Sequence, residues 1–363
     1  MNSLATFLPL QLILQSRSLI TKSIVPGTLS NYAAGLLHFT QFCDELRIPE
    51  ALRMPASEDI LTLFVAAKGA HKVSATTIKH WLLGLELWHT VNGAPWLGAS
   101  ALKCALKVTS IFPFYFIGSI TVHQASASLA PASSTRPKRA PVTIDHLRSL
   151  RRHLDFTDPF EVTIFAGACV AFWAQARLGE LIFDGSFDPL LHASRGDFTL
   201  SCSTSGRRYG KLWVPRTKTK PLGDSLIFTD SNCECSAIAA LLAHFQTNSS
   251  IPSSAPVFAF ETLDGSFSPM RRSWFLARCN DIWQRENPAR LLGHAFRIGG
   301  TTHLLLLGVD PFIVMVQGRW SSTAFLSYWR LCEEIVPLFV GFSLESKLSI
   351  LSTMSSFKAK LVN

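Results

Sequence analysis

A linker near the middle of the chain constrains the fold more than any other feature. Residues 125–153 have the sequence "ASASLAPASSTRPKRAPVTIDHLRSLRRH", in which a Ser/Ala/Pro-rich stretch runs into a basic segment. A stretch of this composition is typical of a connection between folded units. Because a chain of 363 residues is also longer than one hydrophobic core usually supports, the sequence predicts two domains.

The part before the linker is predicted to be helical. Apolar residues recur at helical spacing in segments separated by turn residues, which are 28–46, 57–70, 74–93 and 98–107. We therefore expect residues 1–107 to form an all-helical domain. Its apolar start has no preceding basic residue and predicts a helix, not a signal peptide. Thr76 and Lys79, at the start of the third helix, can offer a hydroxyl and a cation to phosphate, although ordinary helix capping explains this pattern equally well.

Residues 108–137 connect the two predicted domains. Within them, residues 108–124 fit neither the helical domain nor the linker that follows. Their sequence, "VTSIFPFYFIGSITVHQ", is aromatic, lacks turn residues and is too apolar for a linker. Val codons begin with GT and a Gln codon can be CAG, so the segment is consistent with a short in-frame intron retained in the coding sequence. A transcript that keeps the segment at full abundance would contradict this hypothesis.

Residues 138–345 are predicted to form a second domain that is mainly α with a small antiparallel β-sheet. Residues 197–229 alternate in period two around Gly-containing turns, which indicates two or three antiparallel strands. The remainder is predicted to be helical, including 267–283. The apolar run at 160–176 is interrupted by charged and polar residues and predicts a buried core helix, not a membrane span. Residues 346–363 are expected to be a tail.

The charge of the chain favours a polyanionic partner. It has 34 Lys and Arg against 25 Asp and Glu, a formal net charge of +9. Basic residues concentrate at the linker, where a basic hinge suits a clamp around a duplex, although a solvated linker is the commoner explanation. The basic side chains that we expect to contact DNA are Lys79, Arg136, Lys138, Arg139 and Arg271. Eight cysteines lack zinc spacing, so we expect free thiols, no metal site and an intracellular chain.

Several reactive side chains occur at definite intervals in otherwise apolar segments. Arg177 and Glu180 lie one helical turn apart in "ARLGEL", and a buried ion pair alone would explain them. His294 and Arg297 have the same spacing and share one helix face. Two arginines and a histidine that converge would bind one phosphate, because the guanidinium group offers paired donors and keeps its charge.

A lysine, a tryptophan and a tyrosine complete this pattern. Lys218 and Lys220 lie near the turn between the second and third predicted strands, where a lysine can reach a site as a general acid, and we prefer Lys218. Trp320 follows a helix that begins at Asp310 and ends at Gly318, and its indole can donate to a phosphate oxygen. Tyr328 is the right kind of residue for a nucleophile that attacks phosphate.

In this order, the motifs resemble the tyrosine recombinase or phage integrase family of DNA breaking and rejoining enzymes. The resemblance covers roughly residues 138–340, and the helical part before it is similar to the family's core-binding domain. It implies that Tyr328 attacks the scissile phosphate and forms a 3′-phosphotyrosyl link, with no cofactor, ATP or metal. The other implied roles are charge neutralisation by Arg177 and Arg297, leaving-group protonation by Lys218, proton transfer by His294, orientation of the site by Glu180 and a hydrogen bond from Trp320.

The resemblance also implies partners and a setting. The partners would be double-stranded DNA and further copies of the chain in a tetrameric synapse, with no membrane. The "GRW" and "SYWR" motifs look most like recombinases of eukaryotic, particularly fungal, mobile elements, which implies work in the nucleus. Most family members have histidines where this chain has Trp320 and Ile298. A catalytically inactive DNA-binding descendant and, more weakly, a type IB topoisomerase are the alternatives.

Overall fold

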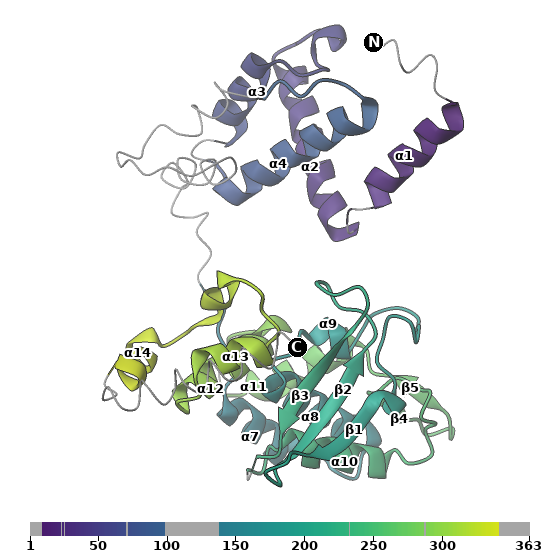
Figure 1. The fold of residues 1–363 in the computed structure, drawn as a ribbon, viewed down its shortest axis with the longest axis vertical. Helices are drawn as coiled ribbons and strands as arrows, with labels where there is room; N and C mark the ends of the chain where they lie inside the picture. The colour runs from purple at the N-terminus through teal and green to yellow at the C-terminus, as the bar shows by residue number, and fades with distance from the viewer. Residues whose placement is uncertain are drawn as a thin grey trace. The chain divides into compact units, whose positions relative to one another are not determined.

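The chain divides into two compact units, Met1–Lys138 and Arg139–Asn363 (Figure 1). The computed structural model describes residues 9–22, 24, 26–69, 72–98, 138–231, 233–286 and 288–340. Within these ranges it is mainly helical with a small antiparallel sheet, which confirms the predicted fold class. Segment 108–124, the linker up to 137 and the tail at 346–363 lie outside the described residues. No helix in the described ranges is both long and apolar enough to cross a membrane.

The first unit is helical, as its periodicity predicts. Its elements are α1 (Leu10–Lys22), α2 (Pro26–Glu45), the short turn η2 (Glu50–Leu52), α3 (Glu58–Phe64), the π-helical turn η3 (Val65–Gly69) and α4 (Ala75–Asn92). Helices α2 and α4 pack so closely that a side chain at Gly35 or Gly84 would overlap the backbone of the other helix. Ser74 caps α4 by accepting a hydrogen bond from the Thr77 amide, so ordinary helix capping does occur at this helix start. The helix predicted at 98–107 lies outside the described residues except for residue 98.

The second unit is built around a buried helix and a three-stranded sheet. Helix α8 (Pro159–Trp173) is buried along nearly its whole length, as predicted for a core helix. Strands β1 (Phe198–Cys202), β2 (Arg208–Val214) and β3 (Asp224–Thr229) pair antiparallel in chain order. The other helices are α7 (Ile144–His153), α9 (Leu178–Leu181), η5 (Arg195–Asp197), α10 (Ala237–Thr247), α11 (Arg272–Trp283), α12 (His294–Leu306), α13 (Pro311–Gln317), η6 (Thr323–Tyr328) and α14 (Cys332–Val340).

One predicted helical segment begins as a strand. Residues of β4 (Ala259–Glu261) and β5 (Phe267–Pro269) form a second hairpin, so the prediction that 267–283 is entirely helical is wrong. The turn between them is stabilised by Asp264, whose carboxylate accepts hydrogen bonds from the side chains of Thr262 and Ser266, and by Gly265, which has a positive φ of 78°. Proline disfavours a helical conformation in the residue before it, so α11 begins only after Pro269.

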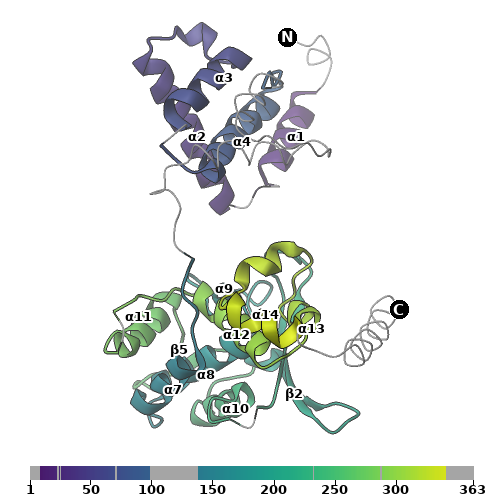
Figure 2. The same cartoon turned by 90° about the vertical axis from the view of Figure 1, so that its left-hand side faces the viewer.

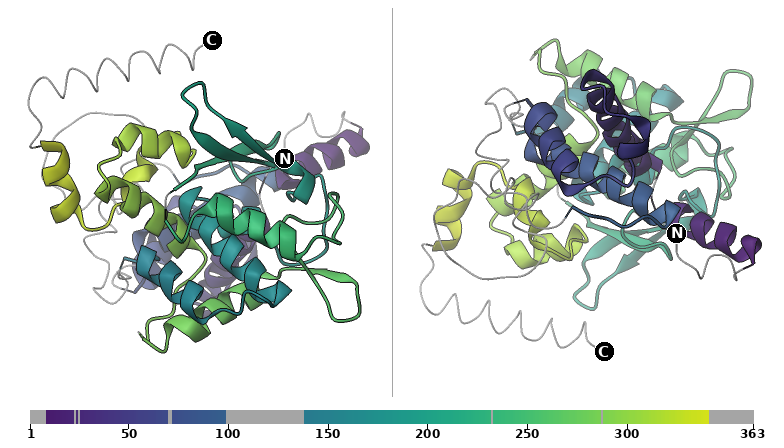
Figure 3. Two further views of the ribbon diagram at one scale, coloured as in Figure 1. Left: turned by 90° about the horizontal axis from the view of Figure 1, so that it is seen from below. Right: turned by 90° about the horizontal axis from the view of Figure 1, so that it is seen from above.

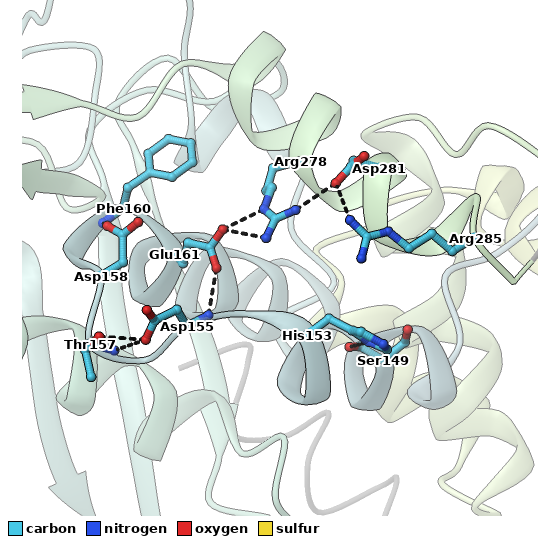
Figure 4. A network of polar contacts seen from close by, with 10 residues as sticks. All are labelled: Ser149, His153, Asp155, Thr157, Asp158, Phe160, Glu161, Arg278, Asp281 and Arg285. Carbon is cyan, nitrogen blue, oxygen red and sulfur yellow. Dashed lines mark hydrogen bonds and ion pairs between the residues drawn. The ribbon is translucent and has the colours of Figure 1, made fainter.

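A polar network ties α8 to α11 (Figure 4). Arg278 donates to the Glu161 carboxylate at 2.7 Å through Nε, and its Nη1 lies 2.7 Å from Asp281. The other Glu161 oxygen accepts from the Asp155 amide at 2.7 Å. This half-buried carboxylate therefore joins the start of the core helix, the loop before it and α11.

The segment from α12 to α14 lies beside the sheet (Figures 2 and 3). Gln317, the last residue of α13, donates to the Trp173 carbonyl at the end of α8 and to the Ile227 carbonyl of β3. Helix α12 is placed by two glycines, because a Cβ at Gly299 would overlap the Val142 carbonyl and one at Gly300 would overlap the Phe172 carbonyl. These contacts bring the ends of α8, α12 and α13 to one place.

We predict that Gly299→Ala lowers the free energy of unfolding by about 3 kcal/mol, because the added methyl group must push α12 away from the Val142 backbone. Chemical denaturation measures the loss. Gly179→Ala is the matched control, since the nearest atom to its new methyl group is the end of the Arg272 side chain at 3.8 Å. Equal stability of the two variants would show that α12 does not depend on this close approach.

Candidate active site

Arg177 and Glu180 form the ion pair that their spacing predicts. The chain leaves α8 through Gln175, whose φ is 48°, and Arg177 is the N-cap of the short helix α9. Its Nη1 donates to Glu180 Oε1 at 2.9 Å, and its amide donates to Glu180 Oε2 at 3.3 Å. The Arg177 side chain remains 23% exposed, so solvent can reach part of it. A partly exposed arginine with a fixed orientation can bind an anion from solution.

Arg297 lies on α12 and is completely buried. Its Nη1 donates to the Gln175 carbonyl at 2.5 Å and its Nη2 to the Gly318 carbonyl at 2.6 Å. The guanidinium carbon lies 3.8 Å from the centre of the Trp320 ring, a cation–π contact. Burial and the nearby Arg177 charge lower the pKa of Arg297 to about 10, so it is still charged at neutral pH.

Trp320 and Tyr328 lie over this arginine, and His294 lies beside Tyr328. The Tyr328 ring lies 5.5 Å from the Arg297 guanidinium, 5.0 Å from the His294 ring and 4.9 Å from the Trp320 ring. Tyr328 ends the 3-10 helix η6, and His294 begins α12. The predicted nucleophile, histidine and second arginine therefore occupy one cluster, and Arg177 lies near enough to influence the pKa values of both His294 and Arg297.

His294 is held in its neutral form. Burial, and then the charges of Arg139, Arg297, Arg177 and Arg330, lower the pKa of His294 to about 4. At neutral pH the ring therefore has a free lone pair and can accept a proton. At neutral pH the ring next to Tyr328 is therefore available as a hydrogen-bond acceptor and not as an acid.

Trp320 does not use its hydrogen-bond donor. Its Nε1 is buried and has no hydrogen-bond partner among the described residues. The indole instead covers Arg297 with its face and contacts Phe325 and Tyr328. A side chain at Gly318 would overlap the Trp320 ring, so glycine is required there for the indole to lie over Arg297.

The two lysines of the β2–β3 turn have different surroundings. Lys218 is exposed and forms no ion pair within the described part of the chain, whereas Lys220 pairs with Asp224 at 2.9 Å. Lys220 lines a pocket of about 840 Å³ together with Arg319 and Trp320, but Lys218 does not line it. The structure thus brings the turn, and not Lys218 itself, to the edge of the cluster.

Two residues of the site were not predicted from the sequence. Arg319 donates to Glu180 Oε2 at 2.5 Å, so the carboxylate is shared with Arg177. Gln175 supplies the carbonyl that binds Arg297, and its own side chain accepts from the Thr301 hydroxyl at 3.1 Å. Arg319 lies directly before Trp320 in "GRW", which is the only sequence signal that could have found it.

The predicted DNA contacts are spread over both units. In the first unit Thr76 is exposed and Lys79 half-buried, and in the second Arg139 is exposed and accepts a hydrogen bond from Arg330 through its carbonyl. Arg271 donates to the Gly185 carbonyl. Lys138 is exposed at the end of the first unit, and Arg136 lies outside the described residues. Within the described ranges, no three His, Cys, Asp or Glu side chains gather into a group that could hold a metal ion.

Solved structures similar to this chain include recombinases and an integrase. No protein-family model and no curated protein matches the sequence. The chain is similar to the XerH site-specific recombinase bound to its difH substrate, with 13% identity over 89% of this chain and 78% of that chain and a TM-score of 0.48. It is similar to the Tn1549 transposon integrase in complex with transposon right end DNA, with 13% identity over 90% and 99% of the two chains and a TM-score of 0.45.

A third similar structure is a Flpe–Holliday junction complex, with 12% identity over 85% of this chain and 79% of that chain and a TM-score of 0.36.

We predict that Arg297→Ala lowers the free energy of unfolding by about 3 kcal/mol, because it leaves the buried Gln175 and Gly318 carbonyls without a donor. Arg285→Ala is the control, since this 57% exposed arginine forms only a surface ion pair worth about 1 kcal/mol or less. Urea denaturation compares the two. Similar stabilities would mean that Arg297 is not a structural support.

We predict that His294 titrates with a midpoint near the low pKa of about 4. Because the unfolded chain binds a proton at a higher pH, stability should fall as pH decreases from about 6.5 towards 4, and His294→Gln should reduce that fall. NMR of the ring protons gives the midpoint. A midpoint above 6 for His294 would contradict the buried, cation-rich surroundings.

Proposed function

We propose that the chain is a tyrosine recombinase that cleaves and rejoins DNA strands through a 3′-phosphotyrosyl intermediate. The observation that carries this proposal is the position of Tyr328, which lies against Arg297, His294 and Trp320 at the end of α12. A tyrosine next to a neutral histidine and an arginine, with a second arginine near both of these, is suited to attack a phosphodiester. The similar solved structures, which include recombinases in complex with DNA, agree with this reaction class.

The proposed reaction follows from these groups. Tyr328 Oη gives its proton to His294, attacks the phosphorus and forms a phosphotyrosyl bond, while the bond from phosphorus to the 5′ oxygen breaks. Arg177 and Arg297 neutralise the charge on the non-bridging oxygens. A lysine of the β2–β3 turn protonates the leaving oxygen, and Lys218 remains our candidate because Lys220 is paired with Asp224. Rejoining is the reverse, with the energy of the broken bond kept in the covalent link.

Arg297 must change its contacts before it can bind a phosphate. Both of its terminal nitrogens are bonded to carbonyls, and Trp320 covers its face. We propose that DNA binding moves the Trp320 and Tyr328 rings away and makes room for the phosphate. An inactive DNA-binding descendant, in which Arg297 is only structural, is the alternative that this arrangement keeps open.

The wider assignments are part of the same proposal. Residues 1–107 would be the core-binding domain, 138–345 the catalytic domain, and double-stranded DNA the partner. Helix α14 buries Ile335 against its own unit but exposes Val336 and Leu338, which are available to a neighbouring copy in a synapse. An origin in a eukaryotic mobile element and work in the nucleus remain expectations from the sequence motifs.

We predict a covalent protein–DNA adduct on a denaturing gel when the chain meets nicked duplexes drawn from the DNA that flanks its gene. Tyr328→Phe should abolish the adduct, because the attacking oxygen is lost. Tyr209→Phe, a change of the same kind on strand β2, should keep it. A version without residues 108–124 should be run beside each, since an adduct formed only by this version supports the retained intron.

Salt-dependent DNA binding is the control for these reactions. A folded chain that binds these duplexes, with and without residues 108–124, yet forms no adduct contradicts the proposed catalysis on them. That result favours the inactive descendant.

A further inference from the structure

Arg319 has a backbone conformation that is unusual for an arginine. Its φ is 61°, in the left-handed region, and it ends α13 by donating its amide to the Val316 carbonyl at 2.9 Å. Glycine is the usual residue at such a helix end, because any side chain is strained there. The preceding Gly318 has an ordinary φ of −75°, so the available glycine is not used for this purpose. A strained backbone conformation persists only where other contacts impose it, and such positions are common at functional sites.

The Arg319 side chain points back to a carboxylate of the site. The side chain is 8% exposed, and its Nη2 lies 2.5 Å from Glu180 Oε2, while Glu180 Oε1 accepts from Arg177. Glu180 is thus held between two guanidinium groups, one on each oxygen. Charge-assisted hydrogen bonds of this kind fix both the distance and the plane of the groups.

We infer that Arg319 is a positioning residue, which fixes the Glu180 carboxylate and through it the orientation of Arg177 towards the scissile phosphate. This inference rests on the proposed function. The same residue also sets the turn whose Gly318 carbonyl accepts from Arg297 at 2.6 Å. One arginine therefore supports both of the phosphate-binding arginines, the first through its side chain and the second through its backbone.

The charges around Glu180 agree with this role. Burial raises the pKa of the Glu180 carboxyl, but Arg319 and then Arg177 outweigh it and hold the pKa below its ordinary value. The charged groups that face this carboxylate are Arg177, Arg319 and the nearby Arg297. Without Arg319, the pKa of Glu180 rises, and a protonated Glu180 no longer forms a charge-assisted bond to Arg177.

The test compares Arg319→Gly with Arg319→Lys in the full chain. Glycine suits the left-handed turn, so the variant should fold while it lacks the guanidinium. Lysine keeps a charge but not the paired donors, so it should restore only part of the function. Arg47→Gly is the matched control, because Arg47 is an exposed arginine with a similar φ of 53° in the first unit.

The first measurement needs no DNA. Phenylglyoxal modifies accessible arginines, and peptide mass spectrometry gives the rate at Arg177. We expect a several-fold faster modification of Arg177 in Arg319→Gly, an intermediate rate in Arg319→Lys and the unchanged rate in Arg47→Gly. An unchanged rate in a folded Arg319→Gly would overturn the inference, whether or not the chain cleaves DNA.

The second measurement is the rate of the Tyr328 adduct as a function of pH. Arg319→Gly should slow the adduct on the order of a hundredfold, as expected for a misplaced binding group. The acid limb of its pH profile should also move to higher pH, because Glu180 becomes protonated at a higher pH than in the unchanged chain. A slower rate with an unshifted acid limb would contradict action through Glu180. If the chain binds the duplexes but forms no adduct with or without residues 108–124, the proposed function fails on them, and the Arg177 modification rate alone decides whether Arg319 positions Glu180 and Arg177.

Discussion

The buried guanidinium of Arg297 is the interaction on which the rest of the second unit depends. It carries a charge in an apolar interior, yet its two terminal nitrogens are bonded to backbone carbonyls and not to a carboxylate. One carbonyl follows α8 and the other ends α13, so Arg297 connects these two helix ends to its own helix, α12. Because a buried charge must keep its hydrogen bonds, the positions of these helix ends are coupled to one another.

Backbone strain is concentrated around the same place. Among the described residues of the second unit, the non-glycine positions with positive φ are Gln175, Arg319 and Leu331. They lie just before Arg177, just before Trp320 and just after the segment that carries Tyr328. Strained conformations persist only where the surrounding contacts impose them, and they are common at functional sites. The residues with strained backbone therefore lie next to the groups to which we propose catalytic roles.

The sequence predicted the parts of the site that depend on local spacing. Period-two alternation predicted the sheet, Asp310 and Gly318 marked the ends of α13, and the separation of Arg177 and Glu180 predicted their pair. Contacts between distant segments could not be predicted, because no local pattern shows that Arg319 reaches Glu180 or that carbonyls surround Arg297. The β4–β5 hairpin was missed because its strands are too short to display a period.

The glycines of α12 have a consequence for how the site can move. Gly299 and Gly300 place this helix directly on two backbone segments, and α13 is anchored to α8 through Gln317. His294 and Arg297 are therefore carried by a rigid frame. Tyr328 is the last residue of the short 3-10 helix η6, which lies beyond this frame. The N-cap of η6 is the exposed Ser322. In the proposed reaction, Tyr328 can therefore advance through a local rearrangement of η6, while the backbone that carries His294 and Arg297 stays in place and the Arg297 side chain changes its contacts.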